Sequence, residues 1–109
     1  MDTQEACIAE TNGRGAHIQL DLGGPKIIDR VLLVEDTRRG QNVREYVVEG
    51  RGFSGWTELA RGADIGDEKT DCFDPVTVLK IRLLVKQSSA RPIIRRLAVF
   101  APRAEQGDA

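Results

Sequence analysis

The sequence predicts an all-β protein built as an antiparallel β-sandwich. Apolar residues recur with a period of two far more often than with the 3.6-residue period of a helix. The apolar segments are short, and residues that favour turns separate them at roughly ten-residue spacing. No segment longer than a turn or two carries a helical stripe. Short strands spaced in this way are typical of β-sandwiches and barrels.

The clearest alternation lies near the start of the chain. Ile18, Leu20 and Leu22 share one face of a strand expected at residues 17–22. Gly23-Gly24-Pro25 then predicts a turn, because glycine and proline interrupt regular strands. Further strands are expected at residues 27–35, 43–49, 56–60, 70–73, 78–85 and 93–100.

Turn residues separate these strands, and the alternation within each strand indicates which side chains face inward. A hairpin is expected at residues 51–55, and Asp74-Pro75 predicts another turn. Trp56 is expected to lie in the core and not to serve as an exposed aromatic platform. The alternation predicts that the following residues are buried: Leu20, Leu22, Val31, Leu33, Val47, Trp56, Leu59, Ile81, Leu83 and Val99.

Counting strand directions predicts which loops share one end of the sandwich. If consecutive strands run antiparallel, the loops at residues 38–42, 62–69 and 86–91 lie at one end, together with His17. Loops at one end of a rigid sandwich commonly carry binding residues. The polar side chains proposed there as ligand-binding residues are His17, Arg38, Arg39, Gln41, Asp64, Lys69 and Arg91.

The segment at residues 62–69 has the features of a turn that also forms one side of a ligand-binding site. We expect Ile65 to point inward and pin the loop, while Gly62 and Gly66 permit a tight backbone path. Asp64 and Lys69 would then face the residues of the neighbouring loops across the end of the sandwich.

Composition and charge exclude several classes of protein. The chain has 109 residues, 40% hydrophobic and 30% charged, which suits one ordinary globular domain. Its 16 basic and 17 acidic residues nearly cancel, which argues against a nucleic-acid partner. No apolar run approaches the roughly 20 residues that span a bilayer.

Cys7 and Cys72 match no zinc or redox motif and could be free or joined. No metal site or cofactor is expected. A structural calcium ion is compatible with the fold, but no pattern indicates one.

The order and spacing of several segments resemble a known family. These segments are IQLDLG, RVLLVED, GQNVREYVVE, WTELARGADIG, VLKIRL and SARPIIRRLAVF. Together they resemble a galactose-binding-like domain, also called factor V/VIII C-type or discoidin-like, most of all the C-terminal β-domain of family 29 α-L-fucosidases. The resemblance implies a jelly-roll sandwich over residues 16–101. Residues 1–15 would form an N-terminal segment, either lacking the family's first strand or supplying a shortened one, and residues 102–109 a frayed tail.

Two departures from the family pattern lie in the proposed ligand loops. The family's Gly-Gln-Arg-Val segment is Gly-Gln-Asn-Val here, so Asn42 replaces an arginine. Asp67 and Glu68 stand where the family usually carries basic residues. Both changes alter the charge that a ligand would meet.

Three functions stay open. The first is a non-catalytic carbohydrate-binding module from a fucosidase-like glycoside hydrolase, binding fucose- or galactose-type glycans weakly. The others are a structural β-domain that packs against a catalytic domain of the same polypeptide, and a protein-interaction module on the same fold. We expect no catalysis, because His17 has no evident nucleophile partner and Asp67 and Glu68 are better explained as turn residues. The resemblance implies an extracellular, periplasmic or lysosomal compartment, which the sequence itself does not indicate.

Overall fold

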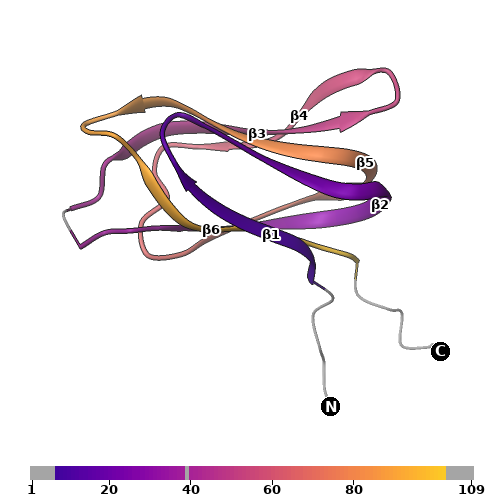
Figure 1. Cartoon of the computed structure of the whole chain (residues 1–109), viewed down its shortest axis with the longest axis horizontal. Coiled ribbons are helices and arrows are strands. Elements are labelled where there is room, and N and C mark those ends of the chain that lie inside the picture. Colours follow the sequence, from indigo (N-terminus) through magenta and orange to yellow (C-terminus); the bar gives the residue numbers. More distant parts are fainter. Residues whose placement is uncertain (1–6, 39, 103–109) are drawn as a thin grey trace, which may run out of the picture.

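The computed structural model describes residues 7–38 and 40–102 and confirms the predicted all-β, antiparallel fold. Within these residues there is no helix. Six strands form one continuous hydrogen-bonded sheet in the order β1-β6-β2-β5-β3-β4. Their bounds are β1 Cys7–Arg14, β2 His17–Glu35, β3 Val43–Gly52, β4 Gly55–Gly62, β5 Lys69–Ser88 and β6 Ile93–Phe100 (Figure 1).

The sheet folds over on itself because β2 and β5 are long enough to take part in two layers. They pair with each other along their whole length, from His17 opposite Leu84 to Leu33 opposite Lys69. Layer A contains β1, β6, the second half of β2 and the first half of β5. Layer B contains the first half of β2, the second half of β5, β3 and β4. Figure 1 shows the layers facing each other, joined at the right where β2 and β5 turn back.

The predicted turn at Gly23-Gly24-Pro25 was wrong, because β2 continues through it as a bend. Asp21 pairs with Lys80 and Lys26 pairs with Val78, so residues 22–25 lie opposite a single residue of β5. Extra residues in one strand form a bulge, which bends the strand and sharpens its twist. Gly23 and Gly24 adopt φ values of +80° and +148° here, which side chains with a Cβ resist.

The predicted turn at Asp74-Pro75 was wrong for a related reason. These residues lie inside β5, where Cys72 pairs with Arg30 and Val76 pairs with Ile28 across a second register shift. A proline has no N–H to donate to a sheet, but an irregular stretch of this kind tolerates it. The seven predicted strands therefore merge into five, and β1 is the sixth strand of the structure.

Although β2 and β5 do not break, each reverses its course as it passes from one layer to the other. The prediction that several loops share one end is therefore confirmed. We call this end, at the left of Figure 1, the loop end; its described residues are 15–16, 36–38, 40–42, 63–68 and 89–92. The opposite end, where β2 and β5 bend and the β3–β4 hairpin turns at residues 53–54, is called the bend end.

The core lies between the two layers and draws side chains from both. The predicted burial is confirmed, with two exceptions, Leu59 and Trp56. The buried residues are Leu20, Leu22, Val31, Leu33, Val47, Ile81, Leu83 and Val99, of which Val47 alone lies outside the core cluster. Leu59 is half-buried and packs against the core from β4.

The placement of Trp56 in the core was wrong. Trp56 is half-buried and pairs across the strands with Arg51 on β3. Gly50, the residue before Arg51, faces the core, since a Cβ added there would lie 2.8 Å from the Leu59 side chain. Because side chains alternate along a strand, Arg51 and its partner Trp56 lie on the outer face of layer B.

The two cysteines cannot pair within the chain. Both are free and exposed. Cys7 is opposite Phe100, Phe100 is opposite Arg30, and Arg30 is opposite Cys72, so three strand spacings, about 14 Å in total, separate them. This exceeds the roughly 7 Å limit between the Cα atoms of a disulfide.

We expect a thiol reagent to titrate both cysteines of the native chain, even after mild oxidation of a dilute monomer. Loss of both thiols with no covalent dimer would contradict the register.

Candidate functional site

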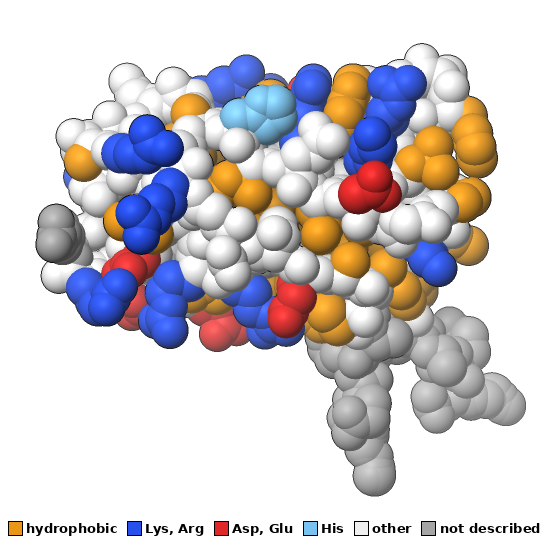
Figure 2. Space-filling model, viewed as in Figure 1, with side chains coloured by type: hydrophobic (Ala, Val, Ile, Leu, Met, Phe, Trp, Pro, Cys, Tyr) orange, Lys and Arg blue, Asp and Glu red, His pale blue; other side chains and the backbone are white. Residues whose placement is uncertain are grey.

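Four loops lie side by side at the loop end, and each of them joins one layer to the other. Their order across the end is residues 15–16, 89–92, 36–42 and 63–68, which follows from the order of the strands they connect. Figure 2 shows several Lys and Arg side chains at this end of the visible face and along its upper edge, whereas hydrophobic side chains gather at the bend end. The loop end is thus a polar surface on a rigid support.

Hydrogen bonds join each loop to its neighbour. The Gly15 N–H donates to the Pro92 carbonyl oxygen at 2.8 Å. The Ser89 N–H donates to the Asn42 carbonyl at 2.8 Å, and the Ser89 hydroxyl lies 3.0 Å from the Asn42 Oδ1. The Thr37 hydroxyl donates to Asp67 Oδ1 at 2.7 Å, which closes the row on the other side. These pairs could not be predicted from the sequence, since short polar residues far apart in the chain give no pairing signal.

Glu35 holds the middle of this surface together. It is the last residue of β2 and is 2% exposed. Its carboxylate accepts hydrogen bonds from the backbone N–H groups of Asn42 (2.7 Å), Val43 (3.1 Å) and Gly66 (3.3 Å). Its own N–H donates to the Gly66 carbonyl at 2.9 Å. One buried side chain therefore determines the relative position of two loops.

The loop at residues 63–68 is anchored as predicted. Ile65 is 3% exposed and belongs to the core cluster, which confirms that it points inward. Gly66 adopts φ +69°, so its role in the tight backbone path is also confirmed. Gly62 has no positive φ and serves a different purpose: a Cβ there would lie 2.8 Å from the Tyr46 ring. It lets the chain pass close to that ring.

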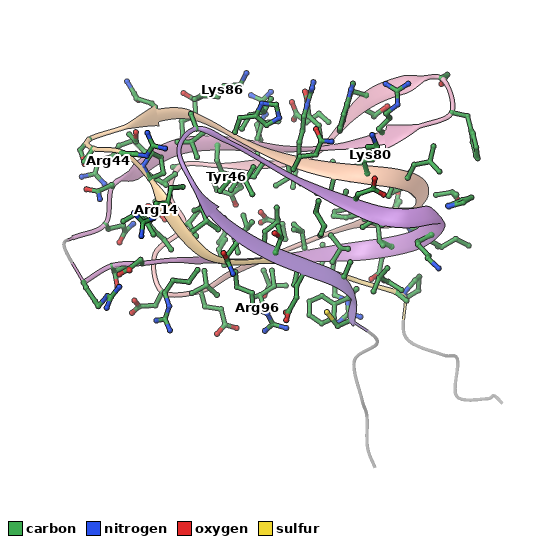
Figure 3. All side chains as sticks on the ribbon, in the orientation of Figure 1. Arg14, Arg44, Tyr46, Lys80, Lys86 and Arg96 are labelled. Atoms are coloured by element: carbon green, nitrogen blue, oxygen red, sulfur yellow. The ribbon has the colours of Figure 1, made fainter. Side chains whose placement is uncertain are left out.

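Beside this loop, Lys69 takes part in a partly buried polar cluster with Tyr46 and Asp71. Tyr46 is fully buried, and its hydroxyl donates to Asp71 Oδ2. The Lys69 ammonium lies 3.0 Å from the Tyr46 hydroxyl and 3.5 Å from Asp71 Oδ1 (Figure 3 labels Tyr46). Burial, followed by the hydrogen bond to Asp71, raises the pKa of Tyr46 well above its usual range. The contacts with Tyr46 and Asp71 thus hold the Lys69 ammonium toward the interior of the protein.

Arg38 is held by the neighbouring residue Asp36. Its Nη2 lies 2.6 Å from Asp36 Oδ2 and its Nε 3.0 Å from Asp36 Oδ1, while its side chain is 84% exposed. These hydrogen bonds keep the pKa of the Asp36 carboxyl well below its usual range. Because the side chain is largely exposed, the remaining N–H groups of the guanidinium are available to a ligand.

The structure places the proposed site residues in a row across the loop end. His17 and Arg91 lie on one side, where the Arg91 guanidinium approaches Gly15. Asp64 and Lys69 lie on the opposite side, next to the end of β4. Three strand spacings, about 14 Å, separate the start of β2 from the end of β4 in layer B. The two sides therefore cannot meet one small ligand at the same time.

Two more of the proposed residues lie between these sides. Gln41 is close to Gly66, since its Oε1 would be 3.5 Å from a Cβ added there. Arg38 is in the same loop, and Arg39 lies outside the described residues. The middle of the row is thus formed by residues 36–38 and 40–42.

The outer face of layer B carries an aromatic residue, Trp56, that was expected in the core. The Arg82 Cζ lies 3.9 Å from the centroid of the Trp56 ring. Arg82 in turn forms an ion pair with Glu49, with 2.6 Å between Nη2 and Oε1. The tryptophan is therefore fixed on the surface by a charged neighbour. Its charged partner Arg51 across the hairpin indicates this placement once the hairpin register is known.

Within residues 7–38 and 40–102, no group of three or more His, Cys, Asp or Glu side chains is arranged to hold a metal ion. No helix in that part of the chain is long and apolar enough to cross a membrane.

Comparison with known proteins gives matches in structure only. No family model and no curated protein matches the sequence. A protein assigned as an α-L-fucosidase from Bacteroides thetaiotaomicron superposes with a TM-score of 0.87 at 24% identity, over 90% of this chain and 22% of that chain. The Ruminococcus gnavus GH29 fucosidase, solved in complex with fucose, gives 0.73 at 31% identity, over 88% of this chain and 20% of that chain.

A smaller protein has the same architecture. The chitosan-binding module 1 of a chitosanase/glucanase from Paenibacillus sp. IK-5 superposes with a TM-score of 0.65 at 17% identity, over 84% of this chain and 75% of that chain. The chain thus spans about a fifth of the length of the fucosidases it matches. It resembles an accessory β-domain of these enzymes and a carbohydrate-binding module.

Proposed function

We propose that the chain is a non-catalytic carbohydrate-binding module that binds fucose- or galactose-type glycans weakly across the loop end. The observation that carries this proposal is the row of four hydrogen-bonded loops on one end of the sandwich. The structural likeness to parts of fucosidases and to a chitosan-binding module supports it. The narrower classification as a discoidin-like domain stays a prediction.

The ligand that fits this row is a glycan of more than one unit. Guanidinium, ammonium and amide groups donate to sugar hydroxyls, and carboxylates accept from them. One unit would lie near His17 and Arg91 and another near Asp64 and Lys69, with Arg38 and Gln41 between them. Arg39 is part of the proposed site through its place in the sequence. The proposed binding is weak, because an exposed polar surface buries little apolar area.

A second candidate function rests on the share of the fucosidase chains that this chain matches. The matched part is about a fifth of each, so the domain could act by packing against a catalytic domain of the same polypeptide. In either function the compartment would be the one in which such an enzyme acts: extracellular, periplasmic or lysosomal.

The proposal predicts amide shifts confined to the loop end. In a ¹⁵N NMR titration with fucose, galactose and their short oligosaccharides, we expect shifts at Gln41, Gly66 and Ser89, larger for the oligosaccharides. Arg91→Ala is expected to weaken binding about tenfold, because it removes a charged donor. Lys26→Ala, an exposed cation at the bend end, is the matched control and should leave affinity unchanged. If none of these sugars shifts a loop-end amide, the domain is structural.

A further inference from the structure

The outer face of layer B contains two cations placed directly opposite each other. Asp21, Lys80, Arg51 and Trp56 form one row across four neighbouring strands, because each is the register partner of the next. Cross-strand partners point to the same face, with Cβ atoms about 4.5–5.5 Å apart. Figure 3 labels Lys80 on the part of β5 that approaches the bend end. Like charges placed in this way destabilise a sheet.

The acid nearest this pair, Asp21, offsets only one of its two charges. In the part of the chain that the structure describes, neither Arg51 nor Lys80 forms an ion pair. Asp21 lies on the far side of Lys80, where its carboxylate accepts the Gly23 N–H at 2.9 Å. In the next row, Glu49 is bound to Arg82 at 2.6 Å. The row of Asp21, Lys80 and Arg51 therefore keeps one net positive charge beside Trp56.

Trp56 adds a fixed aromatic surface to this charge. Its ring is half-buried and stacked against the Arg82 guanidinium, so little rotational freedom is left to lose when a ligand binds. A free inorganic anion would need only the cations. A ligand that uses both features has an apolar face next to a negative group, which is the chemistry of a sugar ring that carries a sulfate ester or a carboxylate.

We propose that this face is a second glycan site, selective for acidic sugars, with the sulfate or carboxylate between Arg51 and Lys80 and the sugar ring beside Trp56. The site is separate from the loop end, because its row lies on the bend side of layer B. It extends the proposed glycan binding to a new ligand class but does not depend on the loop-end site, and each site has its own set of amides.

The experiment is a pair of ¹⁵N NMR titrations of the full chain, one with a chondroitin sulfate hexasaccharide and one with an oligogalacturonide. A sulfated site predicts tighter binding of the first ligand, and a carboxylate site tighter binding of the second. In either case the amides of Arg51, Lys80 and Arg82 and the indole N–H of Trp56 should shift, and affinity should fall as salt rises. Neutral oligosaccharides at the same concentration should leave these signals in place.

The variant that tests the charge is Arg51→Gln with Lys80→Gln, which should weaken binding of the acidic glycan at least tenfold. The matched control is Arg14→Gln with Lys86→Gln, two exposed cations on other parts of the surface (Figure 3). It removes the same charge and should change affinity less than twofold. Trp56→Leu should weaken the glycan but not inorganic sulfate. Equal loss in both double variants, equal binding of a neutral glycan, or inorganic sulfate binding as tightly as the glycan would each overturn the proposal.

Discussion

Replacing Glu35 with alanine is expected to lower the free energy of unfolding by about 3–5 kcal/mol, because three backbone N–H groups lose their acceptor at once. The groups belong to Asn42, Val43 and Gly66, and the carboxylate that they share is 2% exposed. A buried donor left without a partner costs about 1–3 kcal/mol. Water can enter the space left by the side chain and accept some of these hydrogen bonds. The expected loss of stability is therefore smaller than three full penalties.

Two further variants separate this effect from ordinary loss of a surface acid. Glu35→Gln keeps one acceptor oxygen but turns an amide NH₂ toward a backbone donor, so a loss of about 1–3 kcal/mol is expected. Glu68→Ala removes an exposed acid of the neighbouring loop and should change stability by less than about 0.5 kcal/mol. Urea denaturation measures all three. A loss below 1 kcal/mol for Glu35→Ala would show that the loops are held by other contacts.

Tyr46→Ala is expected to cost about 3–5 kcal/mol, because it empties a fully buried site in the core. Tyr46→Phe keeps the ring and removes only the hydroxyl that joins Asp71 and Lys69, so it should cost about 1–2 kcal/mol. If the two substitutions cost the same, the hydroxyl cluster and not the ring would be the source of the stability.

The same residue should give stability a dependence on alkaline pH. In the unfolded chain the hydroxyl ionises near its ordinary pKa of 10.0, while in the folded protein burial and Asp71 raise the pKa far above that value. The contribution of Tyr46 is therefore complete below about pH 10 and declines as pH rises further. The stability difference between the native protein and Tyr46→Phe should shrink between pH 9 and 11. A constant difference would contradict the raised pKa.

The alternation of apolar residues was sufficient to predict the buried face of most strands. Packing two layers requires one face of every strand to be apolar, and this requirement leaves a period-two pattern in the sequence. It could not reveal that the buried positions of β2 change from Leu20 and Leu22 to Val31 and Leu33 within one continuous strand. The register shift between Ile28 and Arg30 produces that change, and backbone pairing determines it.

The loop end could be predicted because each chain reversal, whether a turn or a bend, changes the strand direction in the same way. Individual side-chain contacts could not be predicted from the sequence. Lys69 lies against Tyr46, 23 residues away, and this contact depends on how the layers stack. Trp56 was misassigned because a large aromatic residue within an alternating strand was expected to face inward. The cross-strand partner that places it outside becomes visible only with the hairpin register.

The pairing of Cys7 with Phe100 has a consequence for how such a domain can be built into larger proteins. The first strand begins and the last strand ends one strand spacing apart, about 4.8 Å, at the bend end. A host protein could receive the domain inside one of its own surface loops, with entry and exit nearly touching and little distortion of the host. A short linker between the two ends, with a new opening in the β3–β4 hairpin, would give a circular permutant in which all four loops stay unbroken. The sandwich is therefore a portable unit whose attachment points face away from its proposed loop-end glycan site.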